Sequence, residues 1–238
     1  FSLFLISLMF PSSIIFPLLI KAVPEGTLMT TKHVLMTITN TLYGYGWAGG
    51  FIESLIIKIW YPITAGACSF KYRKLADKFF DETVDEDMYF LRELTVHDFG
   101  YRGDGSEEGA AITGGAHLLS SLGSDNVPAL PFTIRHYNAD IQKPIMCSVP
   151  ASEHSVMCSF SRENELEAFM HMLKIYPKGI VSIVSDTFNV YRVLTEFAAL
   201  LKDIILARDG KVVFRPDSGN PEHIICGDPN APVGSNEW

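Results

Sequence analysis

The sequence predicts an α/β protein, because short β-branched runs alternate along the chain with segments of helical period. Three of these runs, residues 94–96, 180–184 and 212–214, are each followed directly by polar or charged residues. Ligands bind at the carboxyl ends of strands in parallel sheets and barrels, so this placement predicts a binding site there. A hydrophobic content of 47% can form a core and excludes a disordered or coiled-coil chain. The 238 residues allow one large domain or two small ones.

The chain begins with an apolar segment. Residues 1–20 carry no charge and are long enough to cross a bilayer, although two prolines interrupt them. No basic region precedes the apolar run and no small-residue cleavage site follows it, which disfavours a signal peptide. We interpret residues 1–18 as an apolar N-terminal segment of uncertain origin, expect no membrane anchor, and treat the sequence as part of a longer protein.

The first helical stripe has apolar residues at i, i+3, i+4 and i+7 spacing over residues 52–60 and predicts a core-facing helix that ends at Tyr61-Pro62. Residues 44–49, just before it, match the GxGxxG pattern of dinucleotide-binding loops. That function needs an acidic residue about 20 positions further on, and residues 65–75 contain no Asp or Glu. We therefore interpret residues 44–49 as an ordinary glycine-containing loop.

Two further stripes predict core-facing helices over residues 166–173 and 190–201. Ser161 is the expected N-cap of the first of these, with Glu163 and Glu165 favourable near its positive end.

Charge and motif content exclude several classes of function. The net charge of −8, without a cluster of basic residues, disfavours nucleic-acid binding and favours a small-molecule or protein partner. The four cysteines form no CxxC pair, and we predict no metal-ligating residue. The chain has no GxSxG, HExxH or GxxxxGK[ST] motif, and the Ser-Glu-His-Ser run at residues 152–155 is weak support for a hydrolase.

Two polar clusters have the composition of a nucleotide-type site. Residues 97–103 combine an aromatic ring, a guanidinium and two glycines, which suits stacking of a flat heterocycle beside a phosphate. Residues 215–221 place a guanidinium two positions from a carboxylate, so that Arg could grip phosphate while Asp accepts from sugar hydroxyls or approaches a metal. Residue types alone leave a binding site and a structural turn open for both.

The chain resembles the nicotinamide phosphoribosyltransferases of phages and bacteria from about residue 19 to about residue 229. The matching stretches, in order along the chain, are residues 20–26, 60–64, 97–103, 148–151, 153–155, 184–186 and 215–221. The resemblance implies a partial irregular α/β barrel of the type II phosphoribosyltransferase kind, with residues 19–238 as a partial catalytic domain. It further implies a cytoplasmic homodimer whose sites lie at the subunit interface.

The implied enzyme is a pentosyltransferase of NAD salvage. It would join nicotinamide to 5-phosphoribosyl 1-pyrophosphate and form nicotinamide mononucleotide and pyrophosphate. Mg²⁺ would accompany the pyrophosphate, and ATP would be a coupling co-substrate.

The resemblance also implies the substrate-binding residues. Phe99 would stack on the pyridine ring, and Asp125 would accept a hydrogen bond from the carboxamide. Arg102 would contact the phosphoribosyl product, and Arg215 the ribose or amide side of the substrate. Two residues of lower rank in the same pocket are Ser182 and His97.

The implied catalytic residues are His154, Asp186 and Asp217. His154 corresponds to the histidine that the family phosphorylates from ATP. Asp186 and Asp217 would lie near the ribose, the pyrophosphate and the phosphorylated histidine.

Two alternatives stay open beside this interpretation, a nicotinate phosphoribosyltransferase and a non-catalytic binding module that keeps the pocket. Asp125 favours nicotinamide, because a carboxylate accepts the amide N–H but repels the carboxylate of nicotinate. Members of the family are longer at both ends, so we expect this chain alone to be inactive.

Overall fold

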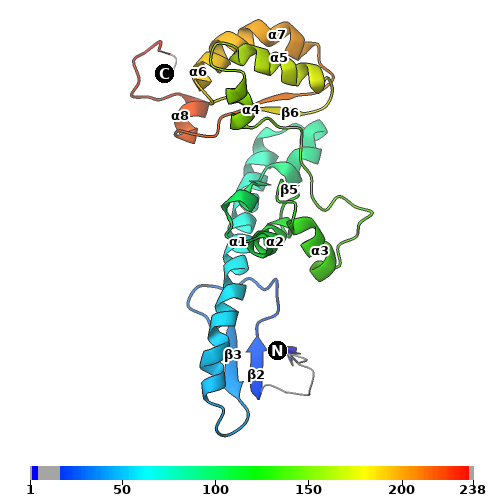
Figure 1. Cartoon of the computed structure of the whole chain (residues 1–238), viewed down its shortest axis with the longest axis vertical. Helices are drawn as coiled ribbons and strands as arrows, with labels where there is room; N and C mark the ends of the chain where they lie inside the picture. The colour runs from blue at the N-terminus through cyan, green and yellow to red at the C-terminus, as the bar shows by residue number, and fades with distance from the viewer. Residues whose placement is uncertain (1, 5–16, 236–238) are drawn as a thin grey trace. The chain divides into compact units, whose positions relative to one another are not determined.

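The computed structural model describes residues 2–4 and 17–235 (Figure 1), so most of the predicted apolar segment, residues 1–18, lies outside the described residues. The chain divides into two compact units, Phe1–Cys147 and Ser148–Trp238, each of which is described by itself. Helices and strands are mixed in both, which confirms the predicted α/β class. The described strands form three small sheets and no closed barrel.

Unit 1 begins with an antiparallel sheet of β1 (Ser2–Phe4), β2 (Leu18–Ala22) and β3 (Met36–Asn40), in that order. The GxGxxG match, residues 44–49, follows β3, and its last three residues are the first residues of helix α1 (Trp47–Thr83). Since β3 pairs antiparallel with β2, this is not the parallel strand–helix–strand setting that a dinucleotide-binding loop requires. Residues 44–46 form a loop as predicted, whereas residues 47–49 belong to α1, so the loop ends three residues earlier than the sequence analysis expects.

Helix α1 contains the first predicted stripe but is much longer than predicted. It spans 37 residues and continues through Pro62, so the predicted end at Tyr61-Pro62 is wrong. Proline removes one backbone N–H donor and crowds the preceding turn, a local cost that hydrogen bonds on both sides of it can outweigh in a long helix.

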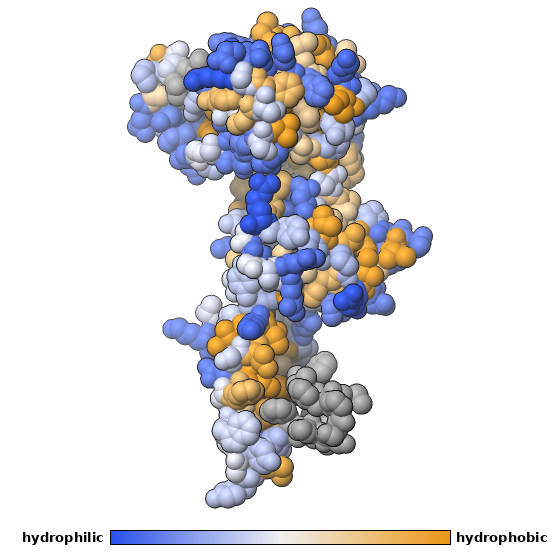
Figure 2. All heavy atoms as spheres, in the orientation of Figure 1, coloured by the Kyte–Doolittle hydropathy of each residue, from blue (hydrophilic) through white to orange (hydrophobic). Residues whose placement is uncertain are grey.

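The stripe on α1 is also not core-facing. Leu55 is 49% exposed and Trp60 is 54% exposed, and hydrophobic side chains gather on the surface over this part of α1 (Figure 2). Helix α1 is long and apolar enough to cross a membrane, but a single helix of this kind is only weak support for a membrane span. Polar contacts tie the C-terminal half of α1 to the rest of unit 1, where Ser69 Oγ lies 2.8 Å from His117 Nδ1 and Arg73 Nη1 donates to Ser120 O.

The predicted strand at residues 94–96 is displaced. Leu94 ends the 3₁₀ helix η1 (Glu86–Leu94), and strand pairing begins at β4 (His97–Asp98), which is parallel to β5 (Gly123–Ser124). Leu94 is part of the helical hydrogen bonding of η1. The strand therefore starts three residues later than the β-branched residues 94–96 indicate.

Helices α2 (Glu107–Leu118) and α3 (Ala129–Tyr137) pack closely against each other. The Ser106 side chain caps α2 by accepting from Gly109 N. At Gly115 a Cβ would lie 2.4 Å from Cδ1 of Phe132, a separation that real Cβ atoms do not reach. The missing side chain at Gly115 therefore allows this approach of the two helices.

We expect Gly115→Ala to destabilise unit 1 by about 1–3 kcal/mol, because the added methyl group must displace the Phe132 ring. Gly50→Ala is the matched control, since Gly50 also lies inside a helix but has nothing within 4 Å of the place that a methyl group would take. The control should gain about 0.5–1 kcal/mol from helix propensity. Chemical denaturation of both variants measures the difference, and equal effects would contradict the close packing.

Unit 2 contains a parallel pair of strands, β6 (Val181–Val184) and β7 (Val212–Arg215), where the sequence predicts two strands. Its helices are α4 (His154–Ser159), α5 (Glu165–Ile175), α6 (Val190–Arg192), α7 (Ala198–Leu206) and α8 (Pro221–Cys226), with the π-helical turn η3 (Val193–Phe197) between α6 and α7. In Figure 1, helices α5 and α7 lie above strand β6. Phe169, Ile183 and Val193 lie at the centre of its core.

Both predicted helices of unit 2 form, with two differences. Ser161 has a φ of +67° and is not the N-cap of α5; Asn164 occupies that place without a side-chain cap hydrogen bond. In the second helical segment Val193 and Leu201 are buried, whereas Leu200 is 66% exposed. The π-helical turn shifts the helical phase, so the buried stripe is narrower than the sequence predicts.

Glu165 lies in the interior of unit 2, with 0% of its surface exposed and no hydrogen-bond partner for either carboxylate oxygen among the described residues. Burial raises the pKa of the Glu165 carboxyl, although the charges of Arg192 and Arg162 oppose the shift. A carboxyl whose pKa is raised by folding favours the folded state fully below its unfolded pKa of about 4.3, and this contribution is lost as the pH rises through the folded pKa.

We therefore expect Glu165→Gln to stabilise unit 2 at pH 7 by about 1 kcal/mol or more, because the neutral amide is less costly to bury than the carboxylate. The gain should shrink toward zero as the pH falls to about 4. Melting temperatures of both proteins between pH 4 and pH 8 measure this, and a gain independent of pH would contradict the assignment. Glu167→Gln, at an exposed position on the same helix, is the control.

Candidate active site

Three predicted site residues of unit 1, His97, Phe99 and Asp125, lie together at the ends of β4 and β5. The two strands are parallel, with His97 opposite Gly123 in the register, so Phe99 and Asp125 follow neighbouring strand ends. Arg102 is carried by the short 3₁₀ helix η2 (Gly100–Gly103) that comes next. We call His97, Phe99, Arg102 and Asp125 the unit 1 cluster.

The geometry of the unit 1 cluster suits a flat polar ring. The rings of His97 and Phe99 have centroids 4.6 Å apart, and Phe99 is 46% exposed. Nε2 of His97 lies 3.2 Å from Oδ2 of Asp125. An exposed aromatic face beside a carboxylate can stack a heterocycle and accept a hydrogen bond from its substituent.

Buried polar groups hold the segment that carries Asp125. Nε2 of His117 lies 2.9 Å from Gly123 O, and the Ser124 hydroxyl accepts from Asn126 N. His117 and Ser124 are both nearly or completely buried, so these contacts are shielded from water. His117 was not among the predicted site residues, and the sequence offers no signal for it beyond its place on a helix.

In unit 2, the structure brings His154, Asp186, Arg215 and Asp217 together at the carboxyl ends of β6 and β7. Val184 lies opposite Arg215 in the parallel register, so Asp186 and Asp217 each follow a strand end by two residues. Two of the three polar strand ends that the sequence analysis singles out therefore meet at one edge of a sheet. We call these four residues the unit 2 cluster.

Asp186 is the centre of the unit 2 cluster, with a side chain only 6% exposed. Its Oδ1 lies 3.1 Å from His154 Nε2, and its Oδ2 accepts from Asp217 N at 3.0 Å and from Ser218 Oγ at 2.5 Å. Burial alone would raise the pKa of the Asp186 carboxyl, but the hydrogen bonds from Ser218, Asp217 N and His154 outweigh it and hold the pKa below its ordinary value. Asp186 is therefore a carboxylate at neutral pH.

The His154 ring is surrounded by carboxylates. Its Nδ1 lies 3.7 Å from Glu153 Oε1 and 3.9 Å from Asp217 Oδ2, opposite the contact of Nε2 with Asp186. Arg215 completes the cluster, since its Nη1 lies 3.8 Å from Asp217 Oδ2. The ring is thus oriented by Asp186 and remains 36% exposed.

The remaining predicted residue of unit 2, Ser182, lies in β6 and is buried. Its backbone N donates to Pro150 O, and its carbonyl accepts from Ser152 N. Ser152 in turn accepts from Val184 N through its hydroxyl and from Arg215 Nη2 through its carbonyl. The predicted site omitted Ser152 and Ser218, although both lie in or beside sequence stretches that carried the prediction.

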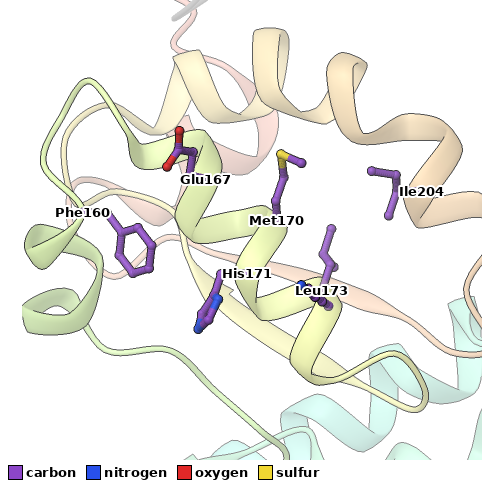
Figure 3. Close-up of a pocket in the computed structure, with 7 residues that line it drawn as sticks. Phe160, Glu167, Met170, His171, Leu173 and Ile204 are labelled. Carbon is purple, nitrogen blue, oxygen red and sulfur yellow. The ribbon is translucent and has the colours of Figure 1, made fainter.

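The described residues contain no group of three or more His, Cys, Asp or Glu side chains arranged to hold a metal ion. Unit 2 also has an open pocket of about 430 Å³ beside α5 and α7 (Figure 3). It is lined mainly by apolar side chains such as Met170, Leu173 and Ile204, and by none of the predicted site residues. This pocket is separate from the unit 2 cluster.

These features define an α/β protein that presents aromatic, acidic and guanidinium side chains at the carboxyl ends of parallel strands, the location at which such folds bind small polar ligands. The sequence pattern of the nicotinate phosphoribosyltransferase (NAPRTase) family matches residues 94–228, which include every predicted site residue. The chain belongs to this family.

Individual relatives give a consistent picture. Nicotinamide phosphoribosyltransferase of Acinetobacter baylyi is 41% identical over 225 residues, which cover 90% of this chain and 43% of that protein. The Xanthomonas campestris protein of the same name is 37% identical, over 88% of this chain and 44% of that protein. The Mycoplasma pneumoniae protein of the same name is 30% identical over 88% of this chain and 44% of that protein. The chain therefore spans less than half the length of these relatives.

Proposed function

We propose that the protein to which this sequence belongs is a nicotinamide phosphoribosyltransferase of NAD biosynthesis. The observation that carries the proposal is the unit 1 cluster, where an exposed aromatic face lies beside a carboxylate that can accept from a carboxamide. The names of the three relatives support the same substrate. The irregular type II barrel and the cytoplasmic homodimer belong to this proposal as well.

In the proposed reaction the pyridine nitrogen of nicotinamide attacks the anomeric carbon of 5-phosphoribosyl 1-pyrophosphate. The new bond joins that nitrogen to the carbon, and the bond from the carbon to the pyrophosphate oxygen breaks with its electron pair leaving on pyrophosphate. The nitrogen lone pair is already free, so no base is required. Positive charge that develops on the ribose is stabilised by carboxylates, and Asp186 is ionised for this role.

Mg²⁺ fits this site through the substrate, since this ion is commonly bound by one or two carboxylates together with substrate phosphates. The described residues lack a preformed metal cage, and Asp217, whose side chain is 55% exposed, is the carboxylate of the unit 2 cluster most open to such an ion. When bound, Mg²⁺ would offset the negative charge of the pyrophosphate. ATP would be the phosphate donor to His154, whose ring Asp186 orients.

A direct assay tests the proposal. The complete polypeptide that carries this sequence is incubated with nicotinamide, 5-phosphoribosyl 1-pyrophosphate, Mg²⁺ and ATP, and both nicotinamide mononucleotide and pyrophosphate are quantified. Equal amounts of the two products are expected. Turnover only with nicotinate identifies a nicotinate phosphoribosyltransferase, and binding of nicotinamide without pyrophosphate release identifies a non-catalytic module.

A further inference from the structure

Asp98 is the last residue of β4, and its carboxylate accepts hydrogen bonds from the segments that follow both strands of the unit 1 cluster. Its Oδ1 accepts from Gly100 N at 2.7 Å, at the start of the turn that carries Arg102. Its Oδ2 accepts from Asn126 Nδ2 at 3.0 Å, directly after Asp125 in the chain. One carboxylate thus fixes the spacing between the loop of Phe99 and the loop of Asp125.

Asn126 is fully buried, and its side-chain amide nitrogen makes two contacts. Besides Asp98, it donates to Ala110 O of helix α2 at 2.9 Å. Both neighbours are acceptors, so only the amide nitrogen, with its two hydrogens, satisfies them together. Asn126 therefore ties the Asp125 segment both to the β4 end and to a helix of the unit 1 core.

Two glycines leave room for these contacts. A Cβ at Gly100 would lie 2.8 Å from Asp98 Oδ1, and a Cβ at Gly114 would lie 2.4 Å from Asn126 Nδ2. Side chains at either position would displace the groups that form the hydrogen bonds. The hydrogen bonds of Asp98 and of Asn126 therefore each depend on a neighbouring glycine.

We propose that Asp98 and Asn126 are positioning residues that set the distance and angle between the Phe99 ring and the Asp125 carboxylate. This inference rests on the proposed function, because it concerns the binding of nicotinamide at that site. Neither residue needs to touch the substrate. A ligand that must stack on one loop and hydrogen-bond to the other is sensitive to their separation, and a displacement of about 1 Å can cost about 100-fold in rate.

The test begins with the unmodified complete polypeptide and measures KM for nicotinamide and for 5-phosphoribosyl 1-pyrophosphate. Asn126→Asp keeps the shape of the side chain but places a carboxylate against Asp98 and the Ala110 carbonyl. We expect KM for nicotinamide to rise at least about tenfold, while KM for 5-phosphoribosyl 1-pyrophosphate changes less than about twofold. Thr133→Val, which removes a buried hydrogen bond to Ala129 O elsewhere in unit 1, should alter stability without this split.

The double variant Asp98→Asn with Asn126→Asp restores a donor–acceptor pair, with the amide donor now at position 98 and the carboxylate acceptor at position 126. We expect it to recover part of the lost affinity, with KM for nicotinamide at least about threefold below that of Asn126→Asp alone. If Asn126→Asp does not fold, as judged by circular dichroism, Asp98→Asn replaces it as the test. The side chain of Asp98 is only partly buried, so a change there disturbs folding less.

The outcomes separate this inference from the proposed function. An unmodified protein that forms no nicotinamide mononucleotide defeats the proposed function, and the inference with it. An active protein whose KM for nicotinamide is unaffected by Asn126→Asp, or by Asp98→Asn where that variant is used, leaves the function standing and overturns the inference. Additive effects in the double variant would also overturn it.

Discussion

Replacement of Asp186 by asparagine is expected to lower the rate of nicotinamide mononucleotide formation by at least about 100-fold. Three donors converge on this carboxylate, from His154, Ser218 and the backbone of Asp217. An asparagine of the same shape has one acceptor oxygen and turns its NH₂ group toward at least one of these donors. The variant would lose the orientation of His154 and the negative charge that the proposed mechanism places beside the ribose.

The assay for this variant is product formation at saturating substrates, with Asp203→Asn, at an exposed position on α7, as the control of equal charge change. A rate within about threefold of the unmodified protein would contradict a central role for Asp186. Stability gives a second readout. Because folding lowers the pKa of Asp186, its carboxylate stabilises the folded state above its unfolded pKa of about 3.9, and this contribution is lost as the pH falls through the folded pKa.

Asp125→Ser is expected to shift substrate preference toward nicotinate. In the proposed binding mode the Asp125 carboxylate accepts from the carboxamide of nicotinamide and would repel the carboxylate of nicotinate, whereas a serine hydroxyl would accept from the first and donate to the second. We expect the ratio of kcat/KM for nicotinamide to that for nicotinate to fall at least about tenfold. His97, 3.2 Å from Asp125, would remain beside the ligand.

This prediction is measured with both substrates in parallel, on the unmodified protein and on Asp140→Ser, an exposed-loop control in the same unit that also removes one negative charge. A ratio that stays constant in Asp125→Ser would mean that another group recognises the carboxamide. An equal fall in the control would assign the effect to net charge and not to contact.

The strands of unit 2 show why part of the site was predictable. Residues 180–184 and 212–214 are rich in β-branched side chains, which favour a strand over a helix. Both runs form parallel strands close to the predicted limits. Parallel pairing aligns their carboxyl ends, so the polar residues that follow come together by geometry alone. Asp186 and Asp217 were therefore recognisable as neighbours from strand position.

Helix α1 shows the opposite case. Its apolar spacing predicted the helix correctly, but Leu55 and Trp60 on that stripe are largely exposed. Periodicity states that one face of a helix is apolar, and it does not state what covers that face. Proline likewise lowers local helix stability without determining whether neighbouring turns outweigh the loss, as they do at Pro62.

The sequence by itself determined the α/β class, the two strands and two of the helical segments of unit 2, and the residue types of the two clusters, because these follow from short-range spacing and side-chain chemistry. Only the tertiary structure decided the contacts that link distant positions, such as Asp186 with His154, 32 residues away, and Asp98 with Asn126, 28 residues away. Such hydrogen bonds depend on ångström-scale distances and on which donors are buried, and both are set when separate segments pack together.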